Sequence, residues 1–200
     1  HVIPASHFDG ENNVDIPRAY RSVKLPWPLS SPYGCNNRLN FDGIVQFPEV
    51  NAYDKNHGYA QIYTTGLIEF VSQKIVSQGD ARYAQLIPSD TFESAIIKGV
   101  EQSLAFYSFE NIAGPYFILL TLLGVKGKYM AGASIAGDFD ASPIDRDVLS
   151  VPDHRIDALD EDVDTALLPI FNHVWRAAGI TGSPYYNYVT KKRDPRLAQT

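Results

Sequence analysis

Residues 59–76, YAQIYTTGLIEFVSQKIV, predict a β-hairpin. Residues 59–63 and 67–76 are its two strands, and in the second a period of two places Leu67, Glu69 and Val71 on one face and Ile68 and Phe70 on the other. Gly66 ends the short turn between them, where a residue with positive φ is needed. The same alternation places Glu69 on a face with apolar neighbours, as is usual for an edge or surface position. We expect this hairpin to be the base of a larger sheet.

Similar patterns on both sides of the hairpin predict an α+β fold. Further strands are expected at residues 1–4, 39–47, 83–87, 116–125 and 129–135. The continuous apolar run at 116–125 is typical of a central strand that is buried on both faces. The predicted architecture is therefore a mixed or mainly antiparallel sheet with two main helices packed on it.

The two helices are predicted from apolar stripes with helical spacing. One starts near residue 88 and ends before Gly114, with Asp90 and Glu93 at the spacing of a capping box. The other runs from about 160 to 178, where Pro169 either kinks one long helix or lies in the first turn of a shorter one.

The chain is predicted to be one domain over residues 1–186 with a basic tail at 187–200. Residues 1–37 hold many Pro, Gly, Asn and Ser residues and are expected to be an extended, loop-rich opening segment. The tail, with Lys191, Lys192, Arg193 and Arg196, is interpreted as a solvated terminus. A chain of 200 residues that starts with His1 rather than Met is expected to be a piece of a longer protein.

Composition limits the classes of function. Hydrophobic residues at 44% and charged residues at 20% fit a soluble globular chain. The net charge of −6 argues against a fold that binds nucleic acid over its whole surface. A single cysteine, Cys35, forms no internal disulfide, and no apolar run reaches the length of a membrane helix. We expect a cytoplasmic protein that does not contact a membrane.

A search for chemical motifs yields no catalytic set, no metal site and no cofactor. Cys35 has no nucleophile signature around it, and Gly132 to Gly137 lacks the spacing of a serine hydrolase elbow. Residues 124–128, GVKGK, have the wrong glycine spacing for a phosphate loop and are interpreted as a turn. No residue is therefore assigned to cofactor binding, and we favour a non-enzymatic protein over an enzyme.

Several ordered stretches carry a resemblance to a family. They are HVIP (1–4), RLNFDG (38–43), YAQIYTTGLIE (59–69), IP with FE (87–88, 92–93), LLGVKG (122–127), IDRD (144–147) and VWRAAG (174–179). In this order they resemble the C-terminal region of microbial proteins that begin with a Schlafen AlbA-type DNA-binding, ATP-binding domain. Thr64 stands where the family pattern has an Arg, and the AlbA-type domain itself is absent from this chain.

The resemblance implies a non-catalytic companion or regulatory module that binds partners. Its implied partner is the upstream AlbA-type domain; a homo-oligomer is also considered, and contact with nucleic acid is expected to be indirect. A first alternative is a small enzyme with a polar cleft that holds at least two of Glu69, Asp145, Asp153, His154 and His173. A second alternative is direct binding of nucleic acid. The sequence leaves the ligand, the oligomeric state, the pathway and the strand order open.

Overall fold

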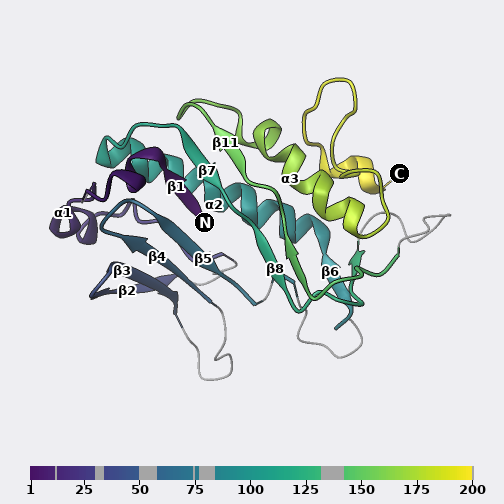
Figure 1. Ribbon diagram of the computed structural model, residues 1–200, viewed down its shortest axis with the longest axis horizontal. Coiled ribbons are helices and arrows are strands. Elements are labelled where there is room, and N and C mark those ends of the chain that lie inside the picture. Colours follow the sequence, from purple (N-terminus) through teal and green to yellow (C-terminus); the bar gives the residue numbers. More distant parts are fainter. Residues whose placement is uncertain are drawn as a thin grey trace. The chain divides into compact units, whose positions relative to one another are not determined.

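The computed structural model describes residues 1–11, 13–29, 34–49, 58–73, 75–76, 84–131 and 142–199 (Figure 1). The chain divides into two units. The first contains His1–Gln73, Ala95–Ile118 and Arg155–Glu161, and the second contains Lys74–Ser94, Leu119–His154 and Asp162–Thr200. The prediction of one domain over residues 1–186 stays a prediction.

A seven-stranded sheet makes up most of the first unit. Its members are β1 (Val2–Pro4), β2 (Cys35–Asn40), β3 (Gly43–Pro48), β4 (Tyr59–Tyr63), β5 (Ile68–Val71), β7 (Tyr116–Ile118) and β11 (His154–Ile156). They lie in the order β11-β7-β1-β5-β4-β3-β2, and β1–β5, β1–β7 and the pairs from β2 to β5 are antiparallel. The hairpin predicted at residues 59–76 is confirmed as β4 and β5, and the α+β class with a large antiparallel sheet is confirmed.

Helix α2 (Ser89–Glu110) packs its C-terminal part on this sheet. The buried Tyr107 hydroxyl lies 2.8 Å from the carbonyl oxygen of Val2 and 2.9 Å from that of Gly66. Its ring stacks on that of Tyr116, with 5.0 Å between centroids. One side chain of α2 thus joins β1, the turn of the β4–β5 hairpin and β7.

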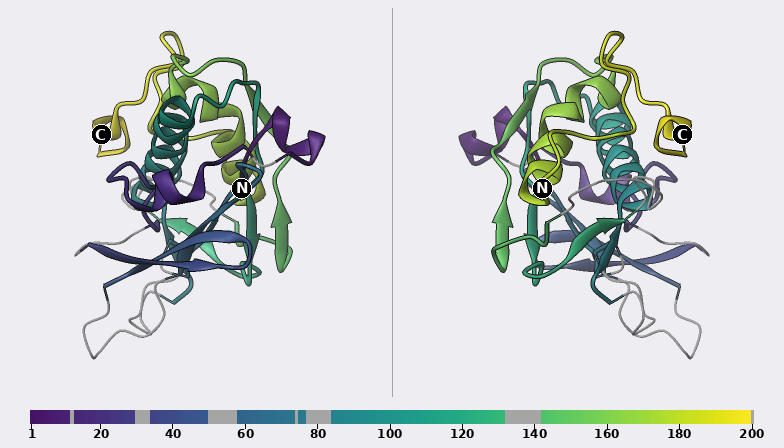
Figure 2. Two further views of the ribbon diagram at one scale, coloured as in Figure 1. Left: turned by 90° about the vertical axis from the view of Figure 1, so that its left-hand side faces the viewer. Right: turned by 90° about the vertical axis from the view of Figure 1, so that its right-hand side faces the viewer.

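The second unit is built around α3 (Val163–Ala177) and two small sheets. Strands β6 (Leu86–Pro88) and β9 (Tyr129–Ala131) are parallel, and β8 (Thr121–Leu123) and β10 (Val148–Ser150) are antiparallel. The first turns of α2 contact α3 through Phe92, whose ring meets Phe171 edge-on at 6.3 Å. Figure 2 shows the C-terminal segment, in yellow, beside α3.

Three short helices complete the described chain. They are η1 (Ala5–Asp9), α1 (Ile16–Tyr20) and η3 (Pro195–Gln199). The opening segment 1–37 is therefore less irregular than predicted. It contains β1, η1, α1 and the beginning of β2. Asp15 caps α1 by accepting a hydrogen bond from the Arg18 amide.

Three strand predictions are wrong in detail. The single strand expected at 116–125 is two strands in different sheets, β7 and β8. The strand expected at 39–47 is the hairpin β2–β3, whose turn is at residues 41–42. We also expected the strand at 129–135 to pair with the neighbouring run at 116–125, but β9 pairs with β6. The predicted continuation over 132–135 and residue 83 lie outside the described residues.

Both predicted main helices are present. Pro169 lies inside a single helix, α3, and not in the first turn of a shorter one. Gly179 follows the C-cap Ala178 and has φ of 80°, the left-handed conformation that commonly ends a helix. Among the described residues, none of the helices has the length and apolar character needed to cross a bilayer.

Candidate functional site

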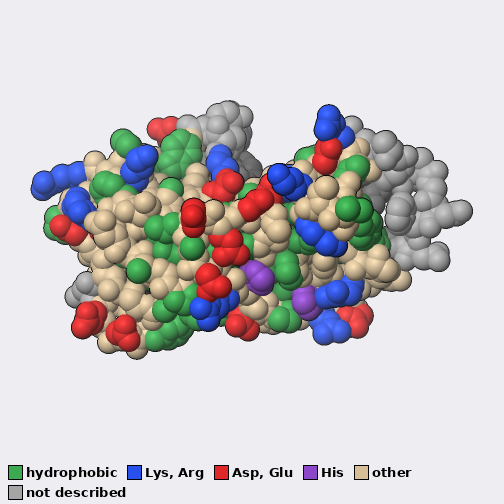
Figure 3. Space-filling model, turned by 90° about the horizontal axis from the view of Figure 1, so that it is seen from above, with side chains coloured by type: hydrophobic (Ala, Val, Ile, Leu, Met, Phe, Trp, Pro, Cys, Tyr) green, Lys and Arg blue, Asp and Glu red, His purple; other side chains and the backbone are tan. Residues whose placement is uncertain are grey.

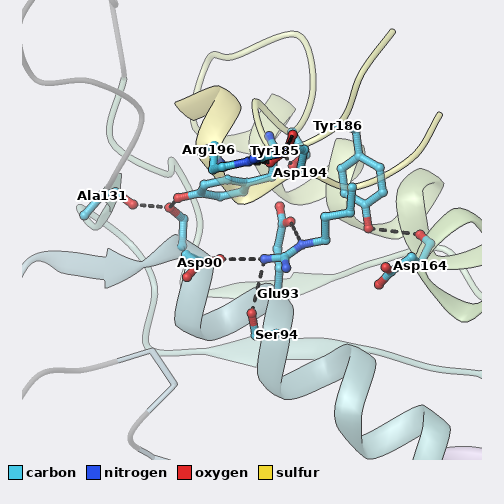
Figure 4. A network of polar contacts seen from close by, with 12 residues as sticks. Asp90, Glu93, Ser94, Ala131, Asp164, Tyr185, Tyr186, Asp194 and Arg196 are labelled. Atoms are coloured by element: carbon cyan, nitrogen blue, oxygen red, sulfur yellow. Dashed lines mark hydrogen bonds and ion pairs between the residues drawn. The ribbon is translucent and has the colours of Figure 1, made fainter. Parts of the chain in front are cut away.

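A buried polar network occupies the second unit, with Glu93 at its centre (Figure 4). Glu93 is on the first turns of α2 and is fully buried. The indole Nε1 of Trp175, on α3, donates to its Oε1 at 2.7 Å. Arg193 Nε lies 3.5 Å from its Oε2. The sequence interpretation of Glu93 as a local helix cap is therefore corrected, because both of its carboxylate oxygens are used in long-range contacts.

Arg193 attaches the C-terminal segment to α2. Its guanidinium donates to Asp90 at 2.6 Å and to Ser94 at 3.2 Å, and it lies over the ring of Tyr185. Only 10% of the Arg193 side chain is exposed. The interpretation of residues 187–200 as a solvated tail is thus wrong at this position, since the tail folds back to neutralise a buried carboxylate.

The Glu93 network is suited to structure rather than to catalysis. Burial raises the pKa of Glu93, and hydrogen bonds from Trp175 and Ser183 together with the charge of Arg193 oppose that rise. A general acid or base must reach a substrate proton directly or through one water. Glu93 is fully buried and its oxygens are already occupied, so it cannot serve in that role in this conformation.

A second carboxylate cluster lies on the first unit's sheet, around Glu69. Its Oε2 accepts hydrogen bonds from the hydroxyls of Tyr59 at 2.8 Å and Tyr63 at 3.4 Å. Its Oε1 lies 3.0 Å from His1 Nε2. β4 presents the two tyrosines on one face, and β5 places Glu69 opposite Gln61, the residue between them. The cluster joins β4, β5 and the first residue of the chain.

The pKa values of the residues in the Glu69 cluster are shifted further from neutral pH. Burial favours a raised pKa for Glu69, but hydrogen bonds from His1, Tyr59 and Tyr63 outweigh it and lower the pKa. Burial, followed by the nearby Glu69, raises the pKa of Tyr59 to about 12 and also raises that of Tyr63. A catalytic acid or base works best with a pKa near the operating pH. The cluster is therefore poorly suited to proton transfer and well suited to holding β4, β5 and His1 together.

We expect the Glu69 cluster to stabilise the fold in a pH-dependent way. Because the folded-state pKa of Glu69 is below its ordinary value of 4.5, its contribution is present above that value and is lost as pH falls through the folded pKa. Glu69→Gln should lower the free energy of unfolding at pH 7 by roughly 1–2 kcal/mol, and by less near pH 3. Urea unfolding at the two pH values measures this, with Glu11→Gln at an exposed position as the control. An equal loss at both pH values would show that charge plays no part.

No contact between described residues brings the five candidates of the enzyme alternative together. Glu69 belongs to the first unit, whereas Asp145, Asp153, His154 and His173 belong to the second. No hydrogen bond or ion pair between described residues joins any two of the five. Asp145 is exposed and pairs with Arg146, and His173 Nδ1 lies 2.8 Å from the Pro169 carbonyl of its own helix.

Metal and thiol chemistry find no support in the described residues either. They hold no group of three or more His, Cys, Asp or Glu side chains able to bind a metal ion. Burial, and then the charge of Glu49, raises the pKa of Cys35, so its thiol is less reactive than an ordinary cysteine. The thiol donates to Gln46 at 2.8 Å. The Gly132–Gly137 motif lies outside the described residues.

The β2–β3 hairpin exposes two large apolar side chains in the first unit. β2 ends the sheet order, so among the described strands only β3 pairs with it. Phe41, in the turn of the hairpin, is 101% exposed, and Leu39 is 54% exposed. An open strand edge next to exposed apolar side chains can accept an additional strand from a partner.

The comparisons with known proteins give no match. No family model matches the chain, and no curated protein or solved structure matches it significantly.

Proposed function

We propose that this chain is a non-catalytic partner-binding module that accompanies or regulates a Schlafen AlbA-type DNA-binding, ATP-binding domain. The observation that carries the proposal is the contrast between the carboxylates Glu93 and Glu69, which are used in internal contacts, and the β2–β3 hairpin, which presents Phe41 to solvent. A catalytic acid or base must be able to reach a substrate proton, and here the carboxylates of Glu93 and Glu69 are already paired within the protein.

The hairpin supplies the proposed contact surface. A partner strand that adds to β2 gains backbone hydrogen bonds along residues 35–40, and Leu39 and Phe41 add apolar burial at one end. The exposed side chains of β2 include Asn36, Asn37 and Arg38. Polar and charged residues on an edge strand reduce indiscriminate aggregation, and so favour a selective partner.

A protein partner fits the surface better than nucleic acid. Residues 34–49, which contain the hairpin, include one basic residue, Arg38, and two acidic residues, Asp42 and Glu49. On a different face, the one drawn in Figure 3, acidic and basic side chains are also interspersed. Direct binding of nucleic acid depends on phosphate contacts from clustered Lys and Arg. The interaction with nucleic acid is accordingly proposed to occur through the partner domain.

Site-specific photo-crosslinking tests the proposal. Phe41 is replaced by the photoreactive amino acid p-benzoylphenylalanine, and the same replacement is made at Val23, which is 92% exposed and lies outside the hairpin. We expect irradiation of cells to join position 41, and not position 23, to a protein that carries a Schlafen AlbA-type domain. Mass spectrometry of the adducts identifies the partner. Equal adducts at both positions, adducts to nucleic acid, or none at position 41 would contradict the proposal.

A further inference from the structure

We propose that residues 187–192 form a preorganised binding loop that docks on the acidic segment 157–162 of a second copy of this chain. The loop belongs to the second unit, residues 157–161 of the segment belong to the first, and both are separate in sequence from the β2–β3 hairpin. Figures 1 and 2 show the loop, in yellow, standing away from α3.

The loop is held in one conformation by its own hydrogen bonds. The side-chain Oδ1 of Asn187 accepts from the amides of Val189 at 2.9 Å and Thr190 at 3.0 Å. The Asn187 amide donates to Lys192 O at 3.0 Å, and the Lys191 amide donates to Asn187 O at 2.8 Å. A loop that is already ordered loses little conformational entropy when it binds.

The base of the loop is fixed to the rest of the second unit. Tyr186 and Arg193 form a β-bridge, the Tyr186 hydroxyl donates to Asp164 O at 2.9 Å, and Arg193 binds Asp90 and Glu93. Tyr186 and Arg193 also cover buried groups, but the residues between them are all exposed, so the loop itself covers no part of the core. The two anchors hold this exposed loop in place.

The loop presents side chains that are typical of a binding surface. Tyr188 is 73% exposed and Val189 is 89% exposed, next to the exposed Lys191 and Lys192. Tyrosine is enriched among residues that dominate binding energy. Lys191 has φ of 58°, a conformation that glycine or asparagine adopts more easily. A lysine in this conformation lowers the stability of the fold, and a binding role for its positive charge accounts for its presence there.

Charge complementarity identifies the occupant. The segment Asp157, Ala158, Leu159, Asp160, Glu161 and Asp162 is exposed along its whole length, and Leu159 is 40% exposed. Asp157 pairs with Arg155, and Glu161 and Asp162 each accept one local hydrogen bond. The segment still offers exposed carboxylates to Lys191 and Lys192, and an apolar side chain to Tyr188 and Val189. Nucleic acid is the weaker match: Arg193 is bound to acidic groups and Arg196 to Asp194, so the tail offers two lysines for phosphates.

Charge reversal and its rescue test the contact. We expect the purified chain to self-associate in sedimentation velocity, with an association that weakens as salt rises from roughly 50 to 500 mM. Lys191→Glu/Lys192→Glu should raise the dimer dissociation constant by at least about tenfold, and Asp160→Lys/Glu161→Lys should do the same. An equimolar mixture of the two variants should associate again, because the reversed loop then meets the reversed segment.

A matched control separates the loop from net charge. Lys98→Glu/Lys126→Glu changes the net charge by the same amount at two exposed lysines outside the loop, and it should leave the association unchanged. Circular dichroism verifies that each variant is folded. A chain that stays monomeric, an association that persists in both reversal variants, or a mixture that stays dissociated would overturn the proposal. Saturable binding of a poly(dT) oligonucleotide that needs Lys191 and Lys192, without self-association, would assign the loop to nucleic acid instead.

Discussion

Replacing Arg193 by alanine is expected to lower the free energy of unfolding by about 3 kcal/mol, because it leaves the buried carboxylate of Glu93 without its cationic partner. The loss should be greatest above the folded pKa of Glu93. At lower pH the carboxylate takes up a proton, and an unpaired neutral carboxyl group is less costly to bury. Urea unfolding of wild type and variant across the acidic and neutral range measures the effect.

Arg196 provides the matched control for this substitution. It lies three residues further along and is 85% exposed, and among the described residues its side chain pairs with Asp194 of the same segment. Arg196→Ala should change the free energy of unfolding by less than about 0.5 kcal/mol. If the two alanine variants were equally stable, the contacts of Arg193 with Glu93 and Asp90 would contribute no net stability. A double-mutant cycle with Glu93→Gln should show strong non-additivity, because the two residues act as a pair.

Replacing Gly43 by alanine is expected to destabilise the protein by at least about 3 kcal/mol, the sum of backbone strain and a steric conflict. Gly43 begins β3 with φ of 145°, and a Cβ there would be 2.2 Å from the carbonyl oxygen of Ile62 in β4. Neither backbone can move without weakening the β3–β4 ladder. The hairpin that carries Phe41 would then lose its attachment to the sheet, so the same variant should also lose the crosslink at position 41.

A substitution at Gly10 distinguishes the effect of backbone strain from that of the steric conflict. It also has positive φ, 72°, but a Cβ at Gly10 meets nothing within 4 Å. Gly10→Ala should therefore cost only about 1 kcal/mol, the strain component. Thermal and urea unfolding of both variants provide the comparison. If both variants lost the same free energy of unfolding, backbone strain alone would explain the effect. The contact between the new Cβ at position 43 and the Ile62 carbonyl oxygen would then be relieved without loss of stability.

Local patterns were sufficient to predict some elements and not others. Alternation and Gly66 predicted the β4–β5 hairpin, and helical stripes predicted α2 and α3. The apolar run at 116–125 was misleading, because continuity of apolar residues cannot reveal that the chain leaves one sheet at Ile118 and enters another at Thr121. The strands β10 and β11 have three residues each inside an acidic segment, and such short pieces carry too little periodicity to be recognised.

The polar networks were the least predictable part. Glu93 shared the helical sector of the buried residues, a signal that its side chain needed a buried partner. Its partners Trp175 and Arg193 are 82 and 100 residues away in sequence, and nothing local links them to it. The same holds for Glu69, whose neighbour His1 is 68 residues away. Contacts of this kind depend on the tertiary fold, which single-sequence periodicity does not encode.

The interior position of β1 in the sheet has a consequence for the order of assembly. β3, β4 and β5 can pair with neighbours that are close in sequence, but among the described strands β1 pairs at Ile68 on one side and at residues 116–118 on the other. During synthesis β1 emerges before both of these partners, so its two edges cannot be covered until residues 116–118 have been made. Pairings between such distant residues slow folding because a long loop must close first. Until then, Val2 and Ile3 are exposed apolar residues on an open strand, the kind of segment that a nascent-chain chaperone protects.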